Sequence, residues 1–185
     1  MESSLAGKLL VATPELGDDL FARSVVLMLQ HDELTAEGVV LNKPLQATVD
    51  DVLPGWQEGA SEPGRVFQGG PVQLDSAIGL ASLPGDDEPP PGLRRLFGAI
   101  SLVDLDTPQE IVWPQVGALR IFAGYSGWSA EQLADEQAKG GWYVVEAEPG
   151  DVFDEDPATL WRRVLRRQSG PLGWVSTFPV DPALN

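Results

Sequence analysis

The chain has 185 residues, 43% of them hydrophobic, and its 12 Lys and Arg stand against 28 Asp and Glu, which gives a net charge of −16. This length and composition predict one folded domain over residues 1–185. The charge argues against binding to nucleic acids or to anionic membranes, because both attract clustered Lys and Arg. With no cysteine and one histidine, a single chain can form no disulfide, no thiolate nucleophile and no two-histidine metal motif.

Short apolar runs in the first half of the chain predict strands. A helical turn is expected over residues 17–22 and a capped helix over Thr48–Leu53. The expected strands are Leu9–Ala12, Ser24–Leu29, Gly38–Asn42, Arg65–Gln68 and Ala77–Ala81. The second and third are close enough to pair as a hairpin across a polar loop from His31 to Glu37. Two glycines before Pro71 permit positive φ and exposed N–H groups between the last two strands.

The second half begins with a Pro- and acid-rich loop at about residues 84–92, expected to be mobile. Strands are expected at Ile100–Val103, Leu119–Ala123 and Trp142–Val145. A capping box at Ser129 starts one helix, and Asp156 followed by proline starts another, with an apolar stripe and four arginines. Strands and helices mix without βαβ alternation and with short links, so the pattern predicts an α+β fold with antiparallel pairing.

The residues available for nucleophilic catalysis are few. Glycine stands two positions before Ser126 but Trp128 stands two after it, so the nucleophile-elbow pattern fails. Any serine triad would use His31 as its base. A small hydrolase that uses Ser24 or Ser126 with His31 is therefore the alternative to a binding function.

No motif in the sequence predicts a metal or a cofactor. The acidic runs at 104–110 and 151–156 are typical of solvated loops and helix caps, and no calcium-loop pattern accompanies them. Walker A and Gly-x-Gly-x-x-Gly patterns are absent. The four arginines of the last helix, at 162, 163, 166 and 167, are expected to bond to nearby acids such as Asp154, Glu155 and Asp156.

Several motifs together resemble one family, the AlgH/YqgE-like proteins of bacteria. These motifs are Gly7–Pro14, Phe21–Leu27, Val39–Pro44, Gln68–Val72, Phe122–Trp128, Gln132-Leu133, Glu136, Gly141-Trp142 and Leu160-Trp161. They run in order over nearly the whole chain. The chain departs from many members at Ile78–Ala81, where they carry a Leu-His pair, and at Ser126, where they carry alanine.

The resemblance implies a bent, bifurcated, largely antiparallel sheet, a pseudo-barrel flanked by helices, and little about chemistry. Some members carry a transcriptional-regulator label that no DNA-binding motif accompanies, and direct DNA binding is the least favoured function here. The favoured function is a non-enzymatic binding or interaction module, with an indirect regulatory role at most. Its partner is an unidentified protein or small molecule. The candidate groove residues are Asn42, Gly69, Gly70, Tyr125, Gly127 and Trp128. The N terminus lacks a basic segment followed by a long apolar stretch, so a cytoplasmic location is expected.

Overall fold

The computed structural model describes residues 4–16 and 21–179, so the helical turn expected over 17–22 lies largely outside the described residues. The strands are β1 Lys8–Ala12, β2 Val25–His31, β3 Thr35–Val40, β4 Pro44–Thr48, β5 Arg65–Gln68, β6 Val72–Ser82, β7 Leu93–Phe97, β8 Ile100–Val103, β9 Ala118–Ser129 and β10 Trp142–Glu146. The helices are α1 Val49–Val52, α2 Gln109–Val112, α3 Ala130–Ala138, α4 Pro149–Val152, α5 Pro157–Arg166 and α6 Pro171–Val175, with 3-10 turns η1 Gln57–Gly59 and η2 Trp113–Gln115.

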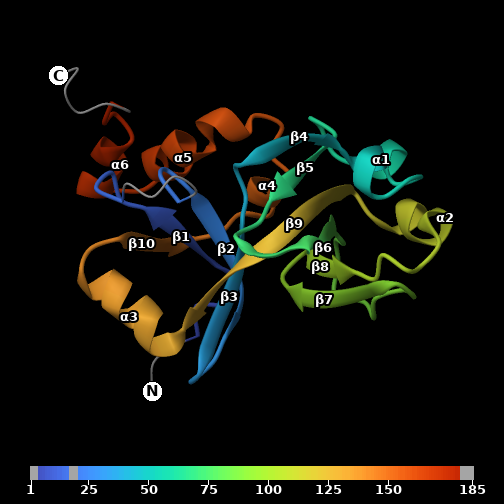
Figure 1. The fold of residues 1–185 in the computed structure, drawn as a ribbon, viewed down its shortest axis with the longest axis horizontal. Helices are drawn as coiled ribbons and strands as arrows, with labels where there is room; N and C mark the ends of the chain where they lie inside the picture. The colour runs from blue at the N-terminus through green and yellow to red at the C-terminus, as the bar shows by residue number, and fades with distance from the viewer. Residues whose placement is uncertain (1–3, 17–20, 180–185) are drawn as a thin grey trace.

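One ten-stranded sheet in the order β10-β1-β2-β3-β9-β6-β8-β7 forms the frame, and β5 attaches to it by pairing with both β4 and β9. Every pairing is antiparallel except that of β5 with β9. The sheet curls into a half-barrel, with α5 and α6 along one end and α3 beside β3 and β10 (Figure 1). The α+β class and the bent, bifurcated, largely antiparallel sheet are therefore confirmed.

Strand β9 is the point at which the sheet divides. Its last residues pair with β3 over Ser126–Ser129, whereas Phe122 and Ala123 pair with β5 on the same edge. The opposite edge of β9 pairs with β6. Gly69 joins the two branches, because its N–H donates to Ala123 O and its carbonyl accepts from Val40 N, each at 2.9 Å. We call this place the sheet fork, and Figure 1 shows β9 crossing it between the two halves of the sheet.

Alternation along the strands fills three cores. In β1, Leu9 and Val11 pack into the core beneath α5, whereas Leu10 and Ala12 pack into the core beneath α3. Successive side chains of a strand point to opposite faces, which accounts for this division. A third core contains Val49, Val112 and Ile121, near α1 and α2. Within the described ranges, no helix combines the length and the apolar character that crossing a bilayer requires.

Several boundaries differ from those expected. Strand β2 extends to His31 and β3 begins at Thr35, so the expected loop from His31 to Glu37 shrinks to residues 32–34. The start of β3 is polar, but its backbone pairs with β9, which local polarity does not reveal. Strands β4 and β7 and the first half of β6 were not predicted, and β9 continues through Ser129 instead of ending at Ala123. The expected loop at 84–92 lies between β6 and β7, and its mobility stays a prediction.

Candidate functional site

Gly69 and Gly70 of the candidate groove are packing residues of the sheet fork. A Cβ on Gly70 would lie within 3.0 Å of three backbone atoms of Tyr125 and Ser126, and a Cβ on Gly69 would collide with Gly124 O. Neither glycine uses the positive φ that glycine permits, whereas Gly124 has φ +69°. The Gly69 N–H and C=O are both bonded within the sheet, so this turn presents no N–H group of Gly69 to an anion. The requirement for glycine here comes from close backbone approach.

The two aromatic residues of the candidate groove pack into different cores. Tyr125 is half-buried against the core beneath α5, and Trp128 is 6% exposed in the core beneath α3. Trp128 meets Trp142 edge to face at 6.0 Å, and both indole N–H groups donate to Glu136 Oε2, at 2.8 and 3.0 Å. Tyr125 and Trp128 therefore do not line one groove, and Gly127 is an exposed position on β9.

Asn42 is the one candidate groove residue that lines a described cavity. Its Oδ1 accepts from Val25 N at 3.0 Å, and its Nδ2 donates to Arg23 O at 2.9 Å. The second bond holds the backbone of Arg23, which has φ +55°, and the first holds Val25 two residues later. For a residue with a Cβ this conformation costs roughly 1–2 kcal/mol and persists only where the surroundings impose it. The amide of Asn42 thereby fixes the direction in which the Arg23 side chain leaves the backbone.

The Asn42 cavity has a volume of about 430 Å³, within the range of small-molecule sites. It opens between the segments that flank β1 and β2 and the first turns of α5. Its polar lining is Arg23, Asn42, Lys43 and Arg162, and its apolar lining includes Pro14, Leu16, Pro157 and Trp161. Three of these side chains are cations, in a chain whose net charge is −16.

The cations of the cavity are partly desolvated. Burial lowers the pKa of Lys43, and its Nζ donates to Ala22 O at 2.9 Å. Burial and the nearby charge of Arg162 lower the pKa of Arg23. The Arg23 guanidinium lies 4.3 Å from the ring centre of Trp161, a cation–π distance, and that of Arg162 lies 5.9 Å from the same ring. The indole is 3% exposed and donates to Ala12 O, so it is a fixed wall.

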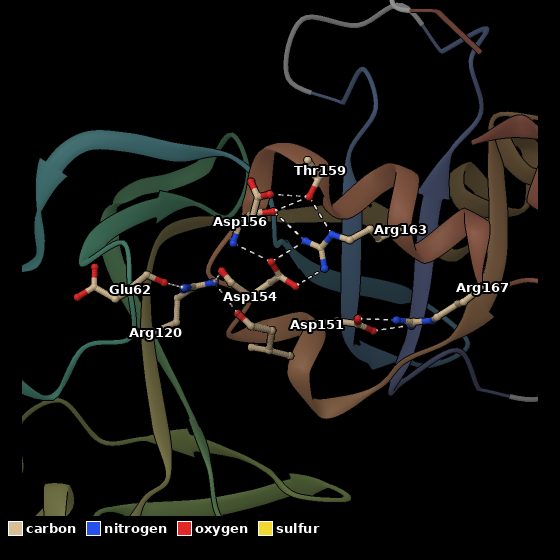
Figure 2. Close-up of polar contacts among 9 residues, drawn as sticks. Glu62, Arg120, Asp151, Asp154, Asp156, Thr159, Arg163 and Arg167 are labelled. Carbon is tan, nitrogen blue, oxygen red and sulfur yellow. Dashed lines mark hydrogen bonds and ion pairs between the residues drawn. The ribbon is translucent and has the colours of Figure 1, made fainter. Parts of the chain in front are cut away.

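Two of the four arginines, Arg163 on α5 and Arg167 at its C-cap, bond to nearby acids as expected. Arg163 makes a two-bond pair with Asp154, at 2.6 and 2.7 Å, and Arg167 makes the same pair with Asp151 (Figure 2). Asp156 accepts from Thr159 Oγ1 at 2.9 Å. Asp151, Asp154 and Asp156 are therefore occupied, and no group of three or more His, Asp or Glu in the described ranges is placed to hold a metal ion.

Arg120 is a buried residue that the sequence pattern did not identify. It is 1% exposed, and its guanidinium donates to Val152 O at 3.1 Å, to Asp154 O at 2.9 Å and to Glu62 O (Figure 2). It stacks on Phe67 at 4.3 Å. Burial lowers its pKa to about 10. Arg120 joins β9 to the segment between α4 and α5, and so it acts as a structural clamp.

The serine–histidine pairs of the hydrolase alternative are not formed. Ser24 and His31 stand seven residues apart along β2, on the order of 20 Å in an extended strand. Ser24 is fully buried, and His31 Nδ1 accepts from Leu5 N at 2.9 Å. Ser126 is fully buried and donates to Gly69 O at 3.0 Å, two strands away from His31. The hydrolase alternative therefore loses its geometric basis.

Comparisons with known proteins agree with this fold. A family model described as AlgH-like matches residues 9–173. A UPF0301 protein of Streptomyces coelicolor is 59% identical over 186 residues, covering 99% of this chain and 96% of that protein. A crystal structure of a Corynebacterium diphtheriae protein has a TM-score of 0.88 at 34% identity, covering 96% of this chain and 94% of that one. The solution structure of the AlgH protein of Pseudomonas aeruginosa has a TM-score of 0.68 at 25% identity, covering 96% and 95%.

Proposed function

The chain belongs to the AlgH-like family, and from that premise we propose that it is a non-enzymatic binding module whose ligand site is the Asn42 cavity. The observation that carries the proposal is that Asn42 bonds to the backbone on both sides of Ser24, at Arg23 O and Val25 N, and Arg23 has a left-handed conformation beside a cavity of small-molecule size. A strained residue held in place at the rim of a cavity is typical of a binding site. The glycines and aromatic residues at the sheet fork serve folding.

A thermal-shift screen with metabolites, nucleotides and divalent metals tests the proposal. A ligand at about 100 times its dissociation constant adds roughly 2.7 kcal/mol to the stability, a rise of about 5–10 °C for a chain of this size. Any regulatory role would be indirect, through the bound ligand or a protein partner. We place the module in the cytoplasm, and its recovery in the soluble fraction of gently lysed cells tests that placement.

Two variants locate the site of any ligand from the screen. Asn42→Ala releases Arg23 and should reduce the ligand-induced shift, although it also lowers the melting temperature of the free protein. Ala158 is exposed on the first turn of α5 and lines the cavity, so Ala158→Trp should block the ligand without disturbing the cores. Gln132→Ala, on the exposed face of α3, is the control. A ligand whose shift survives both cavity variants, or a screen without any hit, would contradict the proposal.

A further inference from the structure

Three cations line the Asn42 cavity, and no ion pair among the described residues includes any of them. The ion pairs found within the described ranges are Lys8–Glu146, Arg163–Asp154, Arg167–Glu148 and Arg167–Asp151. Arg23, Lys43 and Arg162 instead donate to neutral backbone carbonyls. Within residues 4–16 and 21–179, these three neighbouring cations meet carbonyls and no carboxylate, in a chain with 28 acidic residues.

The guanidinium groups of Arg23 and Arg162 lie close to the same indole ring. Both guanidinium groups lie near the ring of Trp161, at 4.3 and 5.9 Å, and the charge of Arg162 lowers the pKa of Arg23. The two like charges therefore repel each other. An anion between them would remove this repulsion and would stabilise the charged form of Lys43, whose pKa burial lowers.

Described residues take only part of the donors of the three cations. Among them, Lys43 donates one of its three N–H groups, to Ala22 O. Arg23 donates through one terminal nitrogen to Phe178 O and Pro179 O, and Arg162 donates to Ser176 O. These carbonyls come from the segment that follows α6. An oxyanion competes for these donors, because it adds to the hydrogen bond an attraction between opposite charges that a neutral carbonyl lacks.

We infer that the Asn42 cavity binds a small phosphate-bearing molecule, with the phosphate held by Arg23, Lys43 and Arg162. This inference rests on the proposed function and adds the chemical class of its ligand. Three cations can neutralise the two negative charges of a phosphate, and the guanidinium group fits the geometry of phosphate oxygens. The cavity of about 430 Å³ leaves room beyond the phosphate for a small organic part against Pro14 and Leu16.

Calorimetric titration of the full chain with inorganic phosphate, and with glycerol phosphate as a monoester, tests the inference. Saturable binding is expected, with a dissociation constant for inorganic phosphate on the order of 1 mM, as the limit on energy per ligand atom allows for so small an ion. Glycerol phosphate should bind at least as tightly, because the cavity leaves room for its organic part beside the phosphate. Malonate at equal ionic strength carries the same charge on carboxylates and should bind at least tenfold more weakly.

Charge-removing variants locate the ion. Arg162→Gln and Lys43→Gln should each weaken phosphate binding at least tenfold. Arg166→Gln removes the same charge from the exposed side of the same helix and should leave the affinity unchanged. Arg162→Lys, which keeps the charge, should recover part of the affinity if Arg162→Gln is poorly folded. Equal losses in Arg162→Gln and Arg166→Gln, or malonate binding as tightly as phosphate, would overturn the inference.

The failure of this inference differs from the failure of the proposed function. A wild-type protein that binds no phosphate, yet shows a thermal shift with an uncharged ligand that Ala158→Trp abolishes, keeps its binding function and loses the phosphate assignment. Phosphate binding that survives Ala158→Trp contradicts both, because the ion would then lie outside the Asn42 cavity.

Discussion

Replacing Gly70 by alanine separates a packing role of the fork glycines from a binding role. The added Cβ would lie within 3.0 Å of three backbone atoms of Tyr125 and Ser126, where carbon atoms at rest are about 3.5–4.0 Å apart. The obstacle is backbone of β9, which is bonded to β3 and β6 and cannot rotate away as a side chain does. Inserting extra methylenes into a packed core costs typically about 1–3 kcal/mol, and this case falls at the upper end or above it.

We expect Gly70→Ala to lower the free energy of unfolding by about 3 kcal/mol, with a fall in melting temperature of roughly 6–12 °C. Urea unfolding followed by tryptophan fluorescence measures it. Gly127→Ala is the matched control on β9, the strand against which Gly70 packs, because its Cβ would meet nothing closer than 3.5 Å. A Gly70→Ala protein as stable as the wild type would refute the packing explanation and would restore the glycine pair as a candidate binding element.

Two further predictions concern the charged network near α5. Burial alone would raise the pKa of Asp154, but hydrogen bonds from Arg163 and from Asp156 N and the charges of Arg163 and Arg120 hold that pKa below its usual value. The carboxylate therefore stabilises the fold above the unfolded pKa, near 3.9, and this contribution is lost as the pH falls through the lower folded pKa. Between pH 6 and pH 3 the free energy of unfolding should fall less in Asp154→Asn than in the wild type, and equal falls in urea titrations would contradict the pairing. Arg120→Met should lower the free energy of unfolding by about 3 kcal/mol. The three carbonyls left without a donor cost about 6 kcal/mol in all. Removal of a buried charge whose pKa is about 10 returns about 3 kcal/mol. Calorimetric unfolding checks this value, and an unchanged melting temperature would show that the clamp is unnecessary.

Local patterns in the sequence were sufficient for the elements that bury one apolar face. The stripe of Leu160, Trp161, Val164 and Leu165 predicted α5, and all four side chains are buried. The N-cap half of the capping box predicted at Ser129 is formed, since Ser129 Oγ accepts from Gln132 N at 3.0 Å. The hairpin of β2 and β3 also follows from short spacing between apolar runs. These features depend on neighbours within a few residues, which is why sequence reasoning reached them.

Features that depend on distant pairing were missed. Strands β4 and β7 carry polar or mixed residues and become strands through the partners that the topology gives them. The glycine motif was interpreted as a turn or a groove because close approach to β9 cannot be read from residues 68–72. The sequence alone assigns Trp128 to a groove because its partners lie outside its own strand. Glu136 is in α3 and Trp142 is in β10.

The Asn42 cavity illustrates the same limit. Arg23, Lys43 and Arg162 are far apart in the sequence, and the four arginines of the last helix looked equivalent. The structure separates them, because Arg163 and Arg167 pair with acids whereas Arg162 turns towards Trp161 and the segment after α6. The adjacent Asn42-Lys43 pair was the one local signal for this site.

The most direct test of a binding site at the Asn42 cavity uses the indole N–H signals of protein labelled with ¹⁵N tryptophan. Trp161 is a wall of the cavity, and Trp128 belongs to the core beneath α3. Trp161→Phe and Trp128→Phe assign the two signals. During titration with glycerol phosphate, or with any ligand from the thermal screen, the Trp161 signal should shift progressively to saturation while the Trp128 signal stays in place. A shift of Trp128 with an unmoved Trp161 would contradict the account and would place the ligand at the other core.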